Sequence, residues 1–200
     1  MASRSRAVGR LCWFLVCGLQ AAQVSAQSPG SPASFAAGYS AMRDFAVEET
    51  FPGGWFANFG YELQPWLSAV GEVGGTHKRY DFGEFTRQGP ASPIDTAKGV
   101  THLFTYLAGA RYARPMGGVV PFAQVLGGIA HGTGDVRVFG ETIAETQIDP
   151  VLQIGGGLDT YFSSRFGLRV GADFRRIYAA FGGNNEARVA IGVVIGVSER

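Results

Sequence analysis

Cysteine and lysine are both scarce in this 200-residue chain, with two of each. Cys12 and Cys17 lie in the first seventeen residues, so the rest of the chain has no thiol for a disulfide or a cysteine metal site. Lys78 and Lys98 are far fewer lysines than a soluble protein places on its outer surface. The chain is therefore an unusual candidate for a soluble domain.

Long apolar runs are also missing. The run from Leu11 to Leu19 has about nine residues, whereas a transmembrane helix requires roughly twenty. It follows three arginines and precedes Val24-Ser25-Ala26, the pattern of a secretory signal peptide cleaved after Ala26. We expect a signal peptide at residues 1–26, a Pro/Gly/Ser linker at residues 27–33 and one domain at residues 34–200.

Export would change the charge of the protein. The full chain carries +1 at pH 7, and without Arg4, Arg6 and Arg10 it keeps 14 basic against 16 acidic side chains, a net charge of −2. A nucleic-acid partner would find no basic patch. The 30 glycines show no period of three, which excludes collagen and favours a strand-rich fold.

The segment from Val100 to His131 shows most clearly how the domain is organised. Two apolar runs flank the sequence ARPMGG, whose Pro115 and paired glycines indicate a turn. In the first run, an apolar and aromatic face alternates with a face of small, polar and charged residues, as in a strand. Each run is about as long as a tilted membrane-spanning strand. We predict that this hairpin is one quarter of an eight-stranded barrel.

Six further segments alternate in the same way, at residues 34–42, 55–62, 67–74, 148–160, 166–175 and 187–198. Every second connection is short, which in an up-and-down barrel puts the short turns at one end and the long loops at the other. The longest loop is expected at residues 77–99, and a second polar loop, able to extend the strands as a flap, at residues 132–147. The predicted fold is all-β, an eight-stranded up-and-down antiparallel transmembrane β-barrel.

The composition of the two faces decides which one meets lipid. One phase of the strands is apolar, and the other is small residues with isolated charges, which suits a crowded lumen. Charges facing lipid are costly, so the ionisable residues must point inward and pair there. The predicted lumen charge network has four acids and four bases: Glu62, Glu72, Asp159, Asp173, Arg111, Arg169, Arg175 and Arg188.

Aromatic residues gather near the strand ends, as they do at membrane interfaces. One predicted girdle, beside the short turns, comprises Tyr61, Trp66, Tyr112, Tyr161, Phe162 and Phe166. The other, toward the long loops, comprises Phe51, Tyr80, Phe82, Phe139, Tyr178 and Phe181.

Four stretches, PFAQVLGG from Pro121, IGGGLD from Ile154, FGLRVGADFRRIY from Phe166 and NNEARVAIGVVIGV from Asn184, carry a family resemblance. With the signal peptide, they resemble the small outer-membrane β-barrel family, the opacity-type porin-like proteins related to the OmpA membrane domain. The resemblance covers the chain from about Ser34 onward. It implies location in the outer membrane of a bacterial cell envelope, and its motifs specify fold more than function.

The function expected is therefore a structural or surface-interaction role through the long extracellular loops. A narrow porin for small solutes, a lipid-A-modifying barrel enzyme and a soluble lipocalin-like carrier are the alternatives. His131-Gly132-Thr133 resembles the His and hydroxyl pairing of such enzymes, with Thr in place of Ser. The spacing of His77, His102 and His131 requires no metal site. We expect no catalytic, cofactor or metal site, a monomer, and outer-membrane lipids, lipopolysaccharide and an extracellular ligand as partners.

Overall fold

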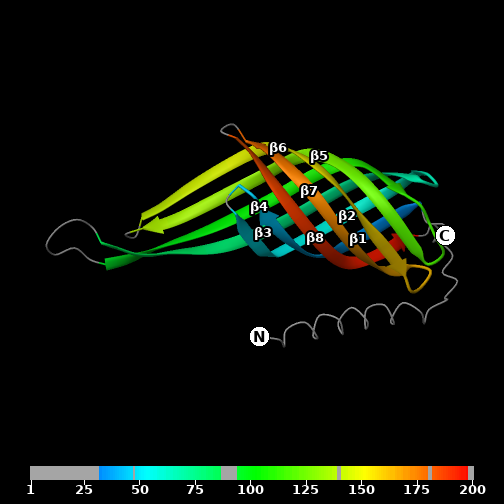
Figure 1. The fold of residues 1–200 in the computed structure, drawn as a ribbon, viewed down its shortest axis with the longest axis horizontal. Coiled ribbons are helices and arrows are strands. Elements are labelled where there is room, and N and C mark those ends of the chain that lie inside the picture. Colours follow the sequence, from blue (N-terminus) through cyan, green and yellow to red (C-terminus); the bar gives the residue numbers. More distant parts are fainter. Residues whose placement is uncertain (1–31, 47, 87–93, 139–140, 180–181, 198–200) are drawn as a thin grey trace, which may run out of the picture.

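The computed structural model describes residues 32–46, 48–86, 94–138, 141–179 and 182–197. They form one closed antiparallel barrel in which each strand pairs with its neighbours in sequence and β8 pairs with β1 (Figure 1). The strands are β1 (Ala33–Asp44), β2 (Glu49–Gln64), β3 (Leu67–Thr86), β4 (Ile94–Ala113), β5 (Val119–Val138), β6 (Glu141–Tyr161), β7 (Phe166–Ala179) and β8 (Gly182–Val197). The predicted fold class is confirmed. The signal peptide and most of the linker lie outside the described residues.

Alternation along the strands sorts the side chains as predicted. On β8, Val189 is 60% exposed on the outer face while Val194 is fully buried inside. The outer face is apolar throughout the barrel, with large exposed side chains such as Phe35, Tyr106 and Ile154. Within the described part of the chain, no helix is long and apolar enough to cross a membrane.

The short turns lie together at one end of the barrel, as predicted. In the turn between β4 and β5, Gly117 has a φ of +65°, and the Met116 N–H donates to the Val119 carbonyl oxygen. The first residue of β1, Ala33, pairs with Tyr61 of β2 and with Val197, the last residue of β8. The barrel therefore starts and finishes at the short-turn end.

The predicted loop at residues 77–99 is wrong in its extent. Strand β3 continues to Thr86 and β4 begins at Ile94, with register from His77 opposite His102 to Thr86 opposite Ile94. At residues 132–147 the strands also continue, as the flap alternative supposed, with Gly132 opposite Gln147. Both hairpins lack the apolar alternation of the barrel wall, which is why the sequence does not predict them, yet the backbone hydrogen bonds of a ladder do not require it.

These extensions form one structure, which we call the projecting sheet and define as residues 77–86, 94–102, 129–138 and 141–150. The strands β3 to β6 pair in order across it, since Lys98 pairs with both Asp81 and Arg137, and Arg137 pairs with Thr142. The register of β3 against β4 shifts once, between Asp81 and Glu84. Within the described residues, β2 pairs with β3 only up to Thr76, and β7 pairs with β6 only from Val151 onward. Figure 1 shows β3 to β6 extending well beyond the other strands at the end opposite the short turns.

The aromatic girdle beside the short turns is present on the outer face, with Tyr61, Trp66, Tyr112, Phe162 and Phe166 each about half exposed. Tyr161 departs from it because its ring packs inward against the cluster around Phe56. At the other end Tyr178 is exposed, but Phe51 is buried on the inner face beneath Lys78. The side chains of Tyr80, Phe82, Phe139 and Phe181 lie outside the described residues.

Candidate functional site

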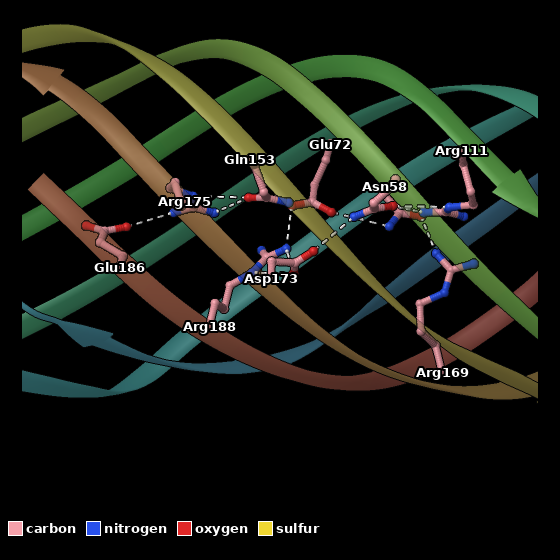
Figure 2. A network of polar contacts seen from close by, with 10 residues as sticks. Asn58, Glu72, Arg111, Gln153, Arg169, Asp173, Arg175, Glu186 and Arg188 are labelled. Atoms are coloured by element: carbon pink, nitrogen blue, oxygen red, sulfur yellow. Dashed lines mark hydrogen bonds and ion pairs between the residues drawn. The ribbon is translucent and has the colours of Figure 1, made fainter.

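Eleven polar side chains cross the interior of the barrel in one connected set, which we call the lumen network. Seven of the eight strands contribute to it, and every member is 8% exposed or less. Its members are Asn58, Glu72, Arg111, Gln124, Gln153, Asp159, Arg169, Asp173, Arg175, Glu186 and Arg188. Figure 2 shows most of them in a row along the barrel, with Glu186 at one end and Arg111 and Arg169 at the other.

The centre of the network is a three-residue ion cluster. Arg188 Nη2 on β8 lies 2.7 Å from Glu72 Oε1 on β3 and 2.7 Å from Asp173 Oδ2 on β7. One guanidinium therefore links two carboxylates from opposite sides of the lumen. Glu72 also accepts from the side-chain amides of Gln153 at 3.2 Å and Asn58 at 3.4 Å. Charged groups buried here are both paired and hydrogen-bonded, which makes their burial tolerable.

Two branches leave this centre. Toward the short turns, Asn58 Oδ1 accepts from Arg169 Nη1 at 2.7 Å, and Arg169 forms a bidentate pair with Asp159 at 2.7 and 2.6 Å. Toward the projecting sheet, Gln153 Oε1 accepts from Arg175 Nη2 at 2.8 Å, and Arg175 lies 3.4 Å from Glu186. The bidentate pair has the geometry of the strong carboxylate and guanidinium interactions.

Arg111 differs from the other three arginines of the network. Its Nε and Nη2 donate to Gln124 Oε1 at 3.1 and 2.8 Å, and within the described residues it has no carboxylate within ion-pair distance. Gln124 in turn donates to Asp173. The Phe122 ring is close to two guanidiniums, with the Cζ atoms of Arg111 and Arg169 4.6 and 4.9 Å from its centre. The ring supplies cation–π stabilisation where a second acid is lacking.

The structure brings together seven of the eight predicted lumen charges and leaves Glu62 out. Glu62 lies at the end of β2, where a bulge precedes the turn, and its side chain is exposed. Glu186 takes its place, so the network keeps four acids and four arginines and a net charge of zero. Sequence reasoning missed Glu186 because strand eight was predicted to begin one residue later, at Ala187.

The three amide side chains of the network carry no charge, so a pattern of ionisable residues does not predict them. Asn58, Gln124 and Gln153 each lie on the inward phase of a strand, and each connects an arginine to a carboxylate. A polar amide in the inward phase of an otherwise small and apolar strand was the available signal. An amide both donates and accepts, so it can extend a chain of hydrogen bonds without adding charge.

The network leaves little space for a solute. The voids beside it are about 10 Å³ each, one next to Glu72 and Arg169 and one next to Arg175 and Arg188. A void of that size holds a single water molecule at most. A larger hollow of about 110 Å³ opens at the short-turn end, below Arg111 and Arg169. The arrangement is that of a plug held by ion pairs.

The histidines lie on the outer face of the barrel rather than in the lumen. His131 and Thr133 share this face on β5, and within the described part of the chain neither contacts a carboxylate. No group of three or more His, Cys, Asp or Glu side chains among the described residues is arranged to hold a metal ion. The lumen network contains no serine, threonine, cysteine or lysine side chain.

Solved structures of other barrels have the same fold. The attachment invasion locus protein Ail of Yersinia pestis, in complex with the heparin analogue sucrose octasulfate, aligns at 16% identity with a TM-score of 0.58, over 82% of this chain and 96% of Ail. Neisserial surface protein A aligns at 12% identity and a TM-score of 0.52, over 82% and 96% of the two chains. OprG from Pseudomonas aeruginosa aligns at 11% identity and 0.53, over 86% and 98%. No curated protein matches this chain in sequence.

The family model for the outer membrane protein beta-barrel domain matches residues 11–198. That range includes all eight strands and every residue of the lumen network. An apolar outer face around a charged, plugged interior is the arrangement of small outer-membrane barrels and the reverse of a soluble carrier with an apolar cavity. The chain belongs to the outer membrane protein β-barrel family.

Proposed function

We propose that this barrel is a monomeric surface-interaction protein that binds an extended, basic peptide segment along the exposed edge of β6. The observation that carries the proposal is the projecting sheet, whose four strands continue beyond the membrane-spanning barrel as an ordered ladder. An open sheet edge presents unpaired backbone donors and acceptors to a strand from another chain. The proposal includes export by the signal peptide, insertion with the short turns toward the periplasm, and the absence of enzymatic activity.

The edge of β6 is the more accessible of the two. From Glu141 to Pro150, β6 pairs with β5 but has no partner on its other side within the described residues. Pro150 lies next to Val151, where pairing with β7 begins, and its missing N–H is tolerated at an edge position. The corresponding edge of β3 is partly covered, because Lys78 pairs with Glu49 of β2 and lies over the Phe51 ring.

The side chains along the β6 edge favour a partner of opposite charge. Glu145 is exposed and Asp149 is half-buried, and Gln147 donates to Asp149 at 3.0 Å. Ile148, 62% exposed, adds an apolar contact point. Two copies of this acidic edge would repel each other, which protects against self-association, whereas a strand with lysine or arginine would be attracted.

The similar structures support a role at the surface without naming this partner. Neisserial surface protein A is by its name a surface protein, and Ail is by its name an attachment protein. The ligand in the Ail complex is a heparin analogue, which is anionic. The acidic edge of β6 points instead to a basic ligand for this chain.

A pair of designed peptides tests the proposal. The folded barrel in detergent micelles should bind a strand-forming peptide of alternating lysine and valine and should not bind its glutamate and valine counterpart. The double substitution Glu145→Lys with Asp149→Lys should reverse this preference. Asp135→Lys is the matched control, because Asp135 is exposed on β5, which is paired with β4 on one side and β6 on the other. This substitution should leave the peptide preference unchanged. Binding of neither peptide, or an equal effect of the control, would reject the edge as the binding surface.

We also propose that a phosphate-bearing outer-leaflet lipid, such as lipopolysaccharide, contacts β1, β7 and β8. Small residues on the outer face form an apolar groove of about 560 Å³, with Ala41, Val189 and Ala172 in one cross-strand row. Arg43, the next outward residue on β1, and Arg176 on β7 lie toward the projecting sheet. Arg43 donates to Thr50 and Arg176 to Asn185, and within the described residues neither forms an ion pair. An acyl chain in the groove would bring its phosphate toward these arginines.

Thermal unfolding in micelles checks this lipid contact. Lipid A should raise the melting temperature more than dephosphorylated lipid A does, and Arg43→Gln with Arg176→Gln should remove the difference. Arg165→Gln, an exposed change at the short-turn end, should not. Equal stabilisation by both lipids would show that only the acyl chains are recognised.

A further inference from the structure

His77 and His102, which are far apart in the sequence, are direct cross-strand partners on β3 and β4. Their ring centres lie 6.2 Å apart with an angle of 25° between the ring planes. Both side chains belong to the outward phase, and His77 is exposed. Two imidazoles therefore face the same solvent region from adjacent strands.

The surroundings leave this pair free to adjust. Gly53 of β2 lies beside His77, and even a Cβ atom there would only reach contact distance, 3.4 Å from His77 Cε1. On the other side, His102 is parallel to the Phe104 ring, with centres 6.5 Å apart and an angle of 7°. Phe104 restrains one ring of the pair, while the space at Gly53 lets the other rotate.

We propose that His77 and His102 form a two-imidazole site for a transition-metal ion such as Cu²⁺, Ni²⁺ or Zn²⁺, with water in the remaining coordination positions. Neutral imidazole is a preferred ligand of these ions. An ion held by one nitrogen of each ring at about 2.1 Å lies about 3.2 Å from each ring centre, so centres up to about 6.4 Å apart can share it when the two nitrogens lie on nearly opposite sides of the ion. The observed 6.2 Å falls within that limit, and rotation of His77 turns its lone pair toward the ion.

The third histidine does not belong to this site. His131 on β5 is opposite Phe104, whereas the residue opposite His102 on β5 is Thr133. His131 is thus displaced along the sheet from the pair, and an aromatic ring occupies the position next to it. It supplies a matched control, being a histidine on the same outer face of the neighbouring strand.

A metal ion bound by His77 and His102 would hold together two strands at the base of the projecting sheet. At His77, β3 passes from the barrel, where β2 is its neighbour, into the projecting sheet, where β4 is its remaining partner. An ion shared by His77 and His102 would link β3 to β4 at the base of that sheet. Because the unfolded chain does not hold these side chains together, binding would stabilise the folded form, and the stabilisation would rise with the logarithm of the metal concentration above the dissociation constant.

Electron paramagnetic resonance of Cu²⁺ added to the folded barrel tests the site. The protein is prepared without a polyhistidine tag, in detergent micelles at neutral pH. One equivalent of Cu²⁺ should give hyperfine structure from two equivalent imidazole nitrogens. His77→Ala and His102→Ala should each reduce it to one nitrogen and weaken binding at least tenfold, while His131→Ala should leave the spectrum and the affinity unchanged.

Thermal unfolding gives an independent measurement. Ni²⁺ or Zn²⁺ should raise the melting temperature of the wild type and of His131→Ala, but not that of His77→Ala or His102→Ala. Both of these variants should migrate on a gel as folded barrel does. A wild type that shows a single-nitrogen spectrum, or no shift in melting temperature with any of the three ions, would overturn the proposal. Equal loss in all three variants would overturn it as well, because it would assign binding to scattered histidines.

Discussion

Each arginine of the lumen network has a different set of partners, so the four should contribute unequally to stability. Arg169 is held by two bonds to Asp159 and one to Asn58, and Arg188 is shared between two carboxylates. Arg111 relies on the neutral amide of Gln124 and on the Phe122 ring. Breaking a buried ion pair leaves its partner charged and desolvated, whereas losing a neutral partner leaves only an unmade hydrogen bond.

Alanine substitutions should therefore follow an order. Arg169→Ala should lower the free energy of unfolding by roughly 3–5 kcal/mol because it leaves Asp159 unpaired in the lumen. Arg111→Ala should cost about 1–3 kcal/mol, since Gln124 loses its donor but no buried charge is orphaned. Val193→Ala on the outer face should cost least because acyl chains fill the gap. Urea unfolding of the folded barrel in detergent measures all three free energies. A larger loss of unfolding free energy for Val193→Ala than for Arg169→Ala would mean that the inner and outer faces are assigned the wrong way round.

Glycine at position 155 also serves the network. A Cβ there would lie 2.1 Å from Asp173 Oδ1 and 2.6 Å from the Ala172 carbonyl oxygen, so Gly155→Ala should displace Asp173 from Arg188 and destabilise the barrel. Gly71 is the matched control, because a Cβ at that position meets nothing within 4 Å. Gly71→Ala should leave the urea midpoint nearly unchanged. Similar midpoints for the two variants would mean that the lumen tolerates the added methyl group.

At the scale of the strands, alternation predicted which face of the barrel each side chain occupies, but not how far the strands extend. The phases of all eight strands follow the sequence because a membrane barrel must put apolar residues outside and polar residues inside. Beyond the membrane that requirement ends, and the extended parts of β3 to β6 have no such pattern to read. The pairing between individual charges also could not be predicted, because it depends on the register across the lumen rather than on order in the sequence.

Hydrogen exchange should reveal the open edge of β6. In an antiparallel strand, successive N–H groups point to opposite sides, so an edge strand has a partner for every second amide only. Amides from Thr142 to Asp149 should alternate between slow and fast exchange, while those from Val151 to Tyr161, paired on both sides, should all be slow. Residue-resolved nuclear magnetic resonance in micelles measures this. Uniform protection from Thr142 to Asp149 would mean that another strand covers the edge.

For the molecule as a whole, conductance through the lumen distinguishes a surface protein from a narrow porin. Eight strands enclose a space that side chains can fill, and here ion pairs cross it with voids of about 10 Å³ beside them. In planar bilayers the purified barrel should therefore conduct far less than an open porin. Arg188→Ala, which removes the link between Glu72 and Asp173, is the variant in which conductance should rise if the network is the barrier. A large, stable conductance of the wild type would favour the porin alternative.

We expect the apolar phase of the strands to face lipid and the charged phase to face a closed lumen. Spin labels on single cysteines at positions 189 to 194 of β8 test this assignment most directly. Each labelled protein is reconstituted into lipid vesicles. The natural cysteines both precede the described residues. Collision with dissolved oxygen, which concentrates in the bilayer, should be high at Val189, Ile191 and Val193 and low at Ala190, Gly192 and Val194, with little collision with a water-soluble nickel complex at any of them. Strong collision of the odd positions with the nickel complex, or the opposite alternation with oxygen, would contradict this assignment of the two faces.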